Sequence, residues 1–335
     1  MKFTYTLLLS AFCIASQPAQ ANINIVFDYS YDGGFFTGAG NTSRQTLLNA
    51  AASVFDTRFT DNLTGITSLG TNQFNIDFAN PSIAQTTTLP NYSVASDKIV
   101  VFVGAYNLGT NVLGQGGPGG YSVSGTQEFI DNAASRGQPG ALGAPAFPGA
   151  TPSQTDFGPW GGTLSFNNAV NYYFGTDAPL AGTTEFDFYS VAVHELGHLL
   201  GFGTADSYYH YVANNVANSV FTGPTVNTLT SNPPVTNDGH WAAGTTYLGQ
   251  EAAMTPGITV GQRKNFTELD FAAMKDIGWQ VTAVPEPETW GMLLAGLGLL
   301  GWRIRGQNGK NRSQTQATSP SEKNIGMIRT RSFAG

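Results

Sequence analysis

The sequence HELGH at residues 194–198 constrains this chain more than any other feature. His194 and His198 are four residues apart, so on a helix they lie on one face and both imidazoles can reach the same ion. Glu195 is offset around the helix and can reach a water molecule on that ion without taking a coordination position. The pattern therefore predicts a helix that carries two zinc ligands and a general base.

The residues around this sequence have the pattern of a buried helix. Thr184 and Asp187 have the spacing of a capping box, which predicts where the helix starts. Gly201 and Gly203 predict where it ends. Apolar residues line one face of the helix between these points: Ala192, Val193, Leu196, Leu199 and Leu200. The sequence therefore places both histidines on an amphipathic helix that is closed by glycine.

The remaining elements predict an α+β fold. Apolar runs predict strands at residues 23–27, 98–106 and 161–167, and helical periodicity predicts helices at 43–60, 127–135 and 267–277. The stretch 107–160 is rich in glycine and proline, so we expect long loops there apart from the short helix.

The first 21 residues have the features of a secretory signal peptide. Lys2 is followed by a short apolar run and by the small residues Ala19 and Ala21, so we expect the mature chain to begin at Asn22. Cys13, the only cysteine, lies inside this segment. The mature chain then has no disulfide, and any metal must be bound by His, Asp, Glu or Tyr.

The charge of the chain is sparse and acidic. Fifteen Lys and Arg stand against 22 Asp and Glu, for a net charge of −7. An acidic surface rich in Gly, Thr, Asn and Ser suits an extracellular protein. It argues against nucleic-acid binding, which depends on basic patches.

The third metal ligand is not fixed by the local sequence. The metzincin proteases place it three residues after the glycine of the motif, where this chain has Thr204, a poor zinc ligand. Asp206, His210 and His240 are the remaining candidates. A site of three histidines suits a catalytic zinc ion, which favours a histidine.

A longer stretch of the chain resembles the leishmanolysin family of zinc proteases. His240-Trp241 is followed by Glu251, by Met254 with Thr255-Pro256, and by the phrase LDFAAMKDIGW at residues 269–279. The resemblance covers residues 184–279 and implies that His240 is the third ligand and that Met254 packs beneath the zinc site. This chain differs from that family in having no cysteine after the signal peptide, so neither its disulfides nor its cysteine latch carries over.

The resemblance implies a metzincin-like domain with a twisted sheet, an active-site helix and a smaller C-terminal subdomain. We expect the N-terminal catalytic subdomain at residues 22–203 and the C-terminal subdomain, with His240 and Met254, at residues 204–281. The cleft would lie between them, with an extended peptide paired to a sheet edge, for which GGTLSFN at residues 161–167 is the predicted strand.

Residues 284–305 resemble the PEP-CTERM sorting signal of Gram-negative bacteria. They contain Pro-Glu-Pro, an apolar run from Trp290 to Trp302 and then arginines. The resemblance implies export, transient membrane association and processing by an exosortase, with the protein at the cell surface or outside the cell. A polar, basic tail follows at residues 306–335 and is predicted to be disordered.

The function predicted from these features is that of a zinc-dependent endopeptidase. His194, His198 and His240 would bind Zn²⁺, and Glu195 would act first as general base and then as general acid on a protein or peptide substrate. A surface or biofilm-matrix protein that keeps an inactive zinc site is the alternative. The presence of Glu195 argues against this alternative, because binding zinc does not require it.

Overall fold

The computed structural model describes residues 22–138, 160–214 and 219–282. Its contacts divide the chain into two units, Met1–Thr282 and Ala283–Gly335, and only the first contains described residues. The predicted signal peptide, the segment 284–305 and the tail 306–335 therefore lie outside the described residues, as does most of the second half of the Gly/Pro-rich stretch, at residues 139–159.

Helices and strands are both present, in agreement with the predicted α+β class. The strands are β1 Asn24–Asp28, β2 Gln73–Ala79, β3 Thr86–Leu89, β4 Lys98–Tyr106, β5 Gly114–Pro118, β6 Gly120–Ser124, β7 Gly161–Asn167, β8 Tyr172–Tyr173, β9 Phe186–Asp187, β10 Val212–Asn214, β11 Ser219–Phe221, β12 Pro234–Val235, β13 Thr246–Tyr247 and β14 Gln250–Glu251. The helices are α1 Thr42–Asp56, α2 Gln127–Ser135, α3 Phe188–Leu199, α4 Asp206–His210, α5 Pro224–Leu229 and α6 Glu268–Asp276. The likeness to a metzincin fold in particular stays a prediction.

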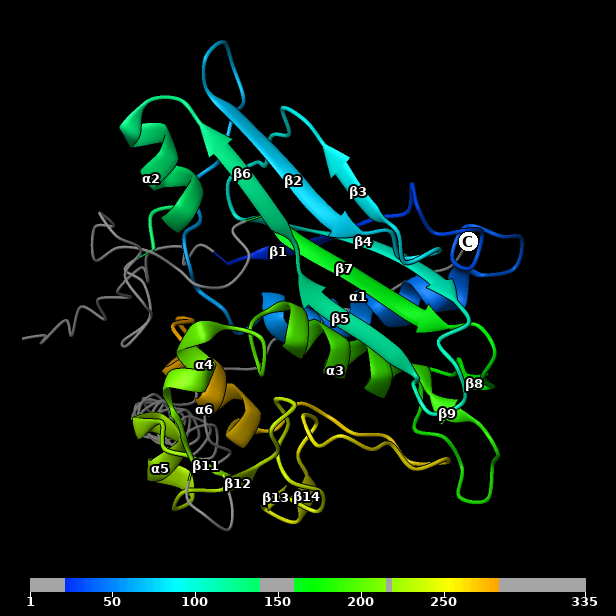
Figure 1. Cartoon of the computed structure of the whole chain (residues 1–335). Coiled ribbons are helices and arrows are strands. Elements are labelled where there is room, and N and C mark those ends of the chain that lie inside the picture. Colours follow the sequence, from blue (N-terminus) through cyan, green and yellow to red (C-terminus); the bar gives the residue numbers. More distant parts are fainter. Residues whose placement is uncertain (1–21, 139–159, 215–218, 283–335) are drawn as a thin grey trace, which may run out of the picture. The chain divides into compact units, whose positions relative to one another are not determined.

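A four-stranded sheet in the order β1-β4-β7-β5 forms the centre of the described unit (Figure 1). β1, β4 and β7 are parallel, and β5 runs antiparallel to β7. β4 is a nearly continuous apolar run that is buried along most of its length, as expected for a strand covered on both faces. β5 has a neighbour on one side only, so it is one of the two edge strands of this sheet, and β1 is the other.

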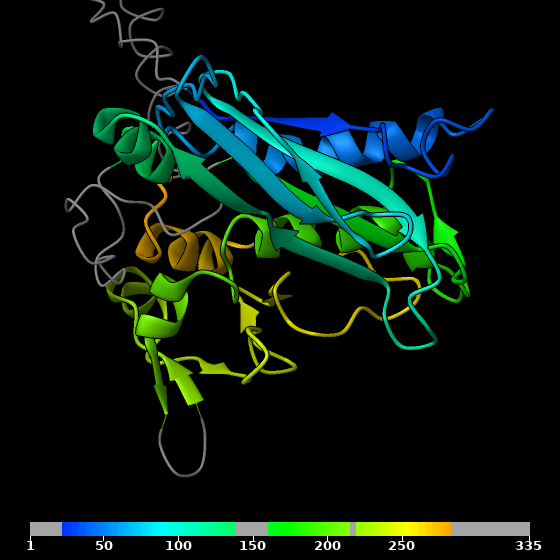
Figure 2. The ribbon, with the colours of Figure 1, turned by 45° about the horizontal axis from the view of Figure 1, so that its top comes forward.

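The helices α1 and α3 cover one face of the central sheet, side by side (Figures 1 and 2). α1 buries the residues that repeat at helical spacing, among them Leu48, Ala51 and Phe55. α3 is buried over almost its whole length because the sheet, α1 and the C-terminal segments surround it. These helices and the inward residues of the sheet, such as Leu164 and Phe166 of β7, share one hydrophobic core.

A second layer covers part of the opposite face of the sheet. It consists of the antiparallel sheet β3-β2-β6 and α2, which packs beside β6. Its own core includes Phe78, which stacks on Phe102 of β4 with ring centroids 4.3 Å apart, and Trp160. Arg136, at the end of α2, is buried and donates to the carbonyl oxygens of Thr64, Ala95 and Lys98.

The C-terminal residues 219–282 return to the N-terminal part and share its main core. Trp279 packs on Phe59 with ring centroids 4.6 Å apart. Arg58 donates through Nε to the Thr282 carbonyl oxygen at 2.7 Å and pairs with the carboxylate of Glu268, while the Thr282 N–H donates to the Arg58 carbonyl at 2.9 Å. The subdomain boundary predicted after Gly203 stays a prediction.

Two local predictions were wrong. The capping box at Thr184 does not form, because Phe186 and Asp187 pair with β8 as strand β9. Asp187 itself caps α3, and its carboxylate accepts the Ser190 N–H at 3.1 Å. Residues 161–167 are strand β7, as predicted, but β7 lies between β4 and β5 and is not an edge.

The edge strand β5 and the next strand in the sequence, β6, lie in the stretch expected to form loops. Glycine gives no apolar alternation to reveal a strand, so the sequence GQGGP carries no strand signal. The helix predicted within this stretch at residues 127–135 is confirmed as α2, and the helix predicted at 267–277 is confirmed as α6, which Thr267 caps.

The buried carboxyl of Asp61 predicts an unusual dependence of stability on pH. Burial raises its pKa from 3.8 to about 6, although its oxygens accept the Gln280 N–H. A carboxyl with a raised pKa in the folded state stabilises that state when protonated, so this contribution is complete below about pH 4 and is lost as the pH rises through about 6.

We therefore expect Asp61→Asn, which keeps an acceptor for Gln280, to increase the free energy of unfolding at pH 8 by on the order of 1–3 kcal/mol. At pH 4 the variant and the wild type should be equally stable. Urea unfolding at both pH values, with EDTA present to remove metal effects, checks this. An equal change at both pH values would contradict it.

Candidate metal centre

The centre begins with helix α3, which carries three of its polar residues. Asp187 starts the helix, and Arg263 fixes this carboxylate through Nε at 2.9 Å and through Nη2 at 2.8 Å. His194, Glu195 and His198 follow within the buried part of the helix. The chain leaves the helix at Gly201, whose φ of +110° is in a region that favours glycine. α3 thus presents the two histidines from a fixed, buried position.

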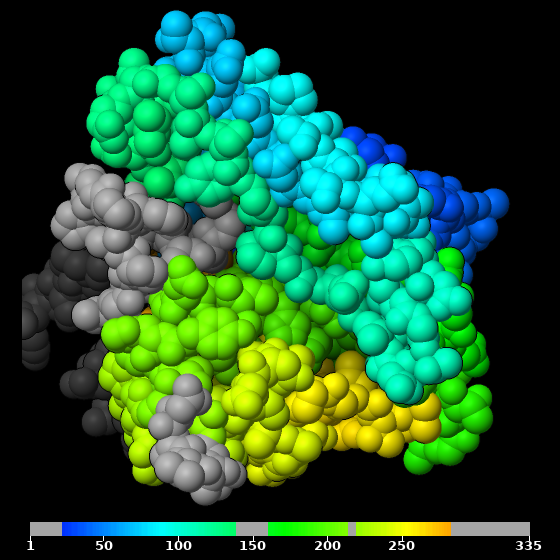
Figure 3. Space-filling model, viewed as in Figure 1, coloured from blue at the N-terminus to red at the C-terminus, as the bar shows by residue number. Residues whose placement is uncertain are grey.

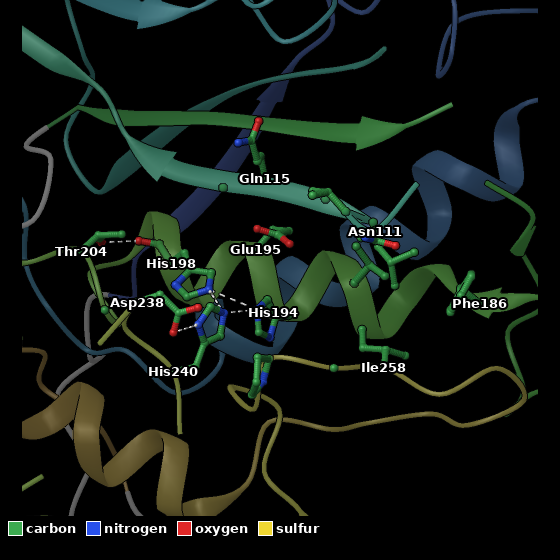
Figure 4. A pocket seen from close by; sticks show the side chains of 18 of the residues that line it. Asn111, Gln115, Phe186, His194, Glu195, His198, Thr204, Asp238, His240 and Ile258 are labelled. Carbon is green, nitrogen blue, oxygen red and sulfur yellow. Dashed lines mark hydrogen bonds and ion pairs between the residues drawn. The ribbon is translucent and has the colours of Figure 1, made fainter. Parts of the chain in front are cut away.

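The Nε2 atoms of three histidines converge at one point (Figure 4). His194 and His198 are 3.1 Å apart at these atoms, and His240 lies 3.2 Å from the first and 3.0 Å from the second. His240 comes from the chain between β12 and β13, more than forty residues away in the sequence. Among the described residues, these three form the group of side chains that could hold a metal ion.

The second ring nitrogen of each histidine has a hydrogen-bond acceptor. Nδ1 of His194 lies 2.7 Å from the Ala253 carbonyl oxygen, and Nδ1 of His198 lies 2.7 Å from the Phe202 carbonyl oxygen. Nδ1 of His240 lies 3.2 Å from a carboxylate oxygen of Asp238. These acceptors assign the proton to Nδ1 in each neutral ring and leave the Nε2 lone pairs directed at the common point.

Burial keeps the two helical histidines neutral. It lowers the pKa of His194 well below its usual value, and the charge of a protonated His198 would lower it further. Burial, and then the charge of His240, lower the pKa of His198 to about 4. A neutral imidazole has a free lone pair at neutral pH, which is the form that binds a metal ion.

The donor set fits a metal ion. Three lone pairs directed at one point repel each other unless a cation lies between them. Nitrogen atoms bound at about 2.0–2.1 Å to one tetrahedral ion are separated by roughly 3.3 Å, close to the distances found here. Imidazole ligands suit zinc, copper, iron and nickel, so the geometry alone does not select one of them.

Two glycines bring His240 to the helix. Gly203 and Gly239, with φ of +71° and +83°, touch through their backbones. A Cβ on Gly239 would lie 2.5 Å from the Gly203 carbonyl oxygen, and a Cβ on Gly203 would lie 2.1 Å from the Gly239 carbonyl oxygen. No side chain fits at either position, and the contact sets how closely His240 approaches His198.

Asp270 of α6 hydrogen-bonds to two segments of the centre, the one that follows His240 and the one that orients His194. Its buried carboxylate accepts from Nε1 of Trp241 at 2.8 Å, from the Ala253 N–H at 3.0 Å and from the Met254 N–H at 3.3 Å. Trp241 follows the third histidine, and Ala253 supplies the carbonyl that orients His194. One carboxylate therefore positions parts of the centre that are distant in sequence.

Met254 packs against α3, while its predicted place beneath a zinc ion stays a prediction. Its side chain is fully buried, and a Cβ on Gly197 would lie only 2.5 Å from its sulfur. Gly197 is the fourth residue of HELGH, so the absence of a side chain there lets Met254 approach α3. The floor of the centre is apolar, which restricts the access of water to the histidines from that side.

Glu195 points toward the edge strand β5 and lines the same cavity as the three histidines (Figure 4). The Gly116 N–H donates to its carboxylate, and burial raises its pKa to about 8. A Cβ on Gly114 or Gly116 would lie within 2.9 Å of Glu195 atoms. The glycines of β5 therefore let the strand pass directly over the carboxylate.

A cavity of about 610 Å³ connects these groups. Its walls are β5 with the preceding residues 110–113, α3, and the segment Pro256–Ile258 (Figure 4). The histidine triad and Asp238 lie at one end, and Phe186 and Ile258 lie toward the other (Figure 4). The cavity thus runs along the β5 edge of the central sheet, with Glu195 and the three Nε2 atoms exposed to it.

The other candidate ligands do not join the cluster. Asp206 and His210 are exposed residues of α4, and His210 packs on the ring of Tyr211. Thr204, at the position expected for a ligand, donates instead to the His198 carbonyl oxygen at 2.6 Å and closes the end of α3. Of the alternatives left open by the sequence, the structure brings His240 alone to the helical pair.

Sequence analysis missed several residues of the centre. Asp238 acts on His240, two residues after it, and Asp270 acts through hydrogen bonds to residues distant in sequence, so its spacing gave no warning. The Gly114 and Gly116 contacts with Glu195 are likewise long-range. The signal that could have been used is the pattern of glycines at alternate positions in GQGG, which permits one strand face to approach a helix closely.

Comparison with known proteins identifies one segment. The family description "PEP-CTERM protein-sorting motif" matches residues 283–306. No curated protein and no solved structure matches the chain. The motif indicates export and sorting to the surface of a Gram-negative cell, with the exosortase machinery as partner. Within the described residues, no helix has the length and apolar character needed to cross a membrane.

Replacement of the third histidine should weaken metal binding strongly. We expect His240→Ala to bind Co²⁺ and Zn²⁺ at least about 100-fold more weakly than the wild type, because it loses one of three protein ligands. His210→Ala, the same change at an exposed histidine of α4, is the matched control and should bind as the wild type does. Competition with a chromophoric chelator measures both. Equal weakening in the two variants would contradict the assigned triad.

The Gly203–Gly239 contact gives a second prediction. Gly239→Ala should lower metal affinity about tenfold or more, because its Cβ would separate the loop of His240 from α3. Gly244→Ala is the matched control: its φ of +79° brings similar backbone strain, but its Cβ would meet no atom within 4 Å. Both variants should lose some stability in thermal unfolding, and only the first should lose metal affinity. Unchanged affinity in Gly239→Ala would show that the contact does not position His240.

Proposed function

We propose that this chain is an exported zinc-dependent endopeptidase. The observation that carries the proposal is the convergence of the Nε2 atoms of His194, His198 and His240 beside the Glu195 carboxylate, in a cavity along a free sheet edge. The resemblance of residues 184–279 to the leishmanolysin proteases supports it, as does the apolar floor formed by Met254. Zinc is proposed because it suits three imidazoles and a buried carboxylate that is not a ligand.

The proposed site residues act together on a peptide bond. A zinc ion on the three histidines would lower the pKa of a water molecule towards neutrality and polarise the scissile carbonyl. Glu195 would take the proton of that water and pass it to the leaving amine. The positive charge nearby favours the carboxylate form of Glu195, which burial alone would hold protonated near neutral pH.

The edge strand β5 is the proposed docking site for the substrate backbone. β5 is an edge strand that lines the cavity opposite Pro256–Ile258, so an extended peptide can pair with its unpaired edge. Hydrogen bonds between a peptide backbone and an edge strand do not depend on the side chains of the peptide, so such a site accepts many sequences. This arrangement replaces the predicted docking at residues 161–167, which lie inside the sheet.

A non-catalytic surface protein with a metal site is the second candidate. The sorting motif favours it as much as it favours the peptidase, since both are exported. Glu195 separates the two proposals: its carboxylate touches none of the three Nδ1 atoms and has no part in the hydrogen bonds that orient the histidines. A protein that only binds metal has no need of this buried carboxylate beside the cavity.

Replacement of Glu195 tests the proposal. The purified full chain, loaded with zinc, should cleave an unfolded protein such as reduced, alkylated casein. Glu195→Gln should slow this cleavage by about 100-fold or more, the usual contribution of a general base, while it keeps one zinc per chain. Glu128→Gln, the same change at an exposed position of α2, should cleave at the wild-type rate.

A chelator gives the complementary control, because EDTA should abolish cleavage and added Zn²⁺ should restore it. Cleavage by Glu195→Gln at the wild-type rate would refute the proposed role of Glu195. A folded, zinc-loaded wild type that cleaves no protein substrate would favour the non-catalytic surface protein.

A further inference from the structure

A second groove, of about 470 Å³, lies on the other side of β5 from the metal centre. Gln115 and Gly116 border both cavities, so one glycine-rich strand separates them. Along β7, Leu164 and Phe166 point into the core with α3, and therefore Thr163 and Ser165 point to the opposite face. The ends of β2 and β3 form the far wall, on the side of the molecule seen in Figure 3.

The charge of the groove excludes anionic ligands. No lysine or arginine is found among the described residues that line it, and Asp77 is its one ionisable carboxyl. Phosphate, sulfate or uronate groups would find no cation to offset their desolvation. A ligand that fits this groove therefore carries no negative charge.

The hydrogen-bonding groups of the groove suit a ligand with many hydroxyls. Thr86, Thr163 and Ser165 supply hydroxyls, which both donate and accept, and Gln115 supplies an amide with both functions. Residues 116–120 are four glycines and Pro118, so no long side chain of this segment fills the groove. A sugar hydroxyl also donates and accepts, and it needs this mixture of partners.

The groove also offers a surface for the apolar face of a sugar ring. Tyr106 of β4 lies at its border, half-buried, and its hydroxyl is held 3.2 Å from the Gln115 side chain. An aromatic ring with a fixed polar end can pack on C–H groups and hydrogen-bond at its edge. Pro118 adds a second rigid apolar surface.

From these observations we infer that the groove between β2, β5 and β7 binds a short neutral oligosaccharide. Its volume lies within the range of about 300–1,000 Å³ that is usual for small-ligand sites. The site lies outside the proposed peptidase centre, and its binding does not require Glu195 or a metal ion.

Isothermal titration calorimetry on the full chain tests this inference. The probes are neutral hexasaccharides (maltohexaose, cellohexaose, mannohexaose and chitohexaose), with a heparin-derived hexasaccharide and a Ser/Thr-rich hexapeptide for comparison. We expect at least one neutral sugar to bind with measurable heat, with EDTA present or absent, and the heparin fragment not to bind.

Two variants locate the site. Tyr106→Ala removes the ring, and Thr86→Arg places a long side chain at the groove from an exposed position that tolerates it. Each should weaken sugar binding about tenfold or more. Tyr247→Ala, at a partly buried tyrosine of β13 that does not line the groove, is the matched control and should bind as the wild type does.

The inference would be overturned by the absence of binding to every neutral sugar up to about 10 mM, an affinity below that of ordinary ligand sites. Binding that is unchanged in both groove variants would place the sugar elsewhere and overturn it too. Binding of the hexapeptide that is tighter than that of any sugar, and that both groove variants weaken, would assign the groove to polypeptide. None of these results depends on whether the chain cleaves protein.

Discussion

The carboxylate of Asp270 is the group on which the arrangement of the metal centre depends. It is fully buried, and burial raises its pKa, so its position is costly without partners. Donors from three separate segments offset this cost: the cap of its own helix at Thr267, the indole of Trp241, and the backbone of Ala253 and Met254. These segments carry or orient two of the three histidines. The buried carboxylate of Asp270 thus holds the segments that carry His240 and orient His194 in place against α3.

Close backbone approach is the second constraint, and glycine provides it wherever two segments meet at the centre. β5 crosses Glu195 at Gly116, Met254 reaches α3 at Gly197, and the loop of His240 meets the end of α3 at Gly203 and Gly239. Because no side chain separates the segments at these glycines, the walls of the cavity lie close together. The glycine-rich strand β5 also borders the second groove on its other side. This edge strand therefore separates the cavity of the histidines from a groove that has no cationic side chain among its described lining residues.

The sequence revealed the local part of this arrangement and missed the long-range part. His194, Glu195 and His198 follow from helical spacing, and β4 and α6 follow from periodicity and caps, since each depends on neighbours in sequence. His240 could not be chosen over Asp206 or His210 by spacing; the family resemblance singled it out, and the structure brings it to the helical pair. β5 was missed because glycine carries no strand signal, and the cap moved from Thr184 to Asp187 because pairing with β8 extends the chain there.

The hydrogen bonds of Arg58 give the described unit a mechanical property. Thr282, its last residue, is bound at both its N–H and its carbonyl to Arg58, which also pairs with Glu268, while the sorting motif starts at residue 283. Tension on the chain from a surface attachment would reach this clamp first. The pull would be shared with the end of α1 and the start of α6 before it could displace Trp279 or the metal centre. A protein tethered by its C-terminal segment could then be stretched at its attachment and still keep its histidines in place.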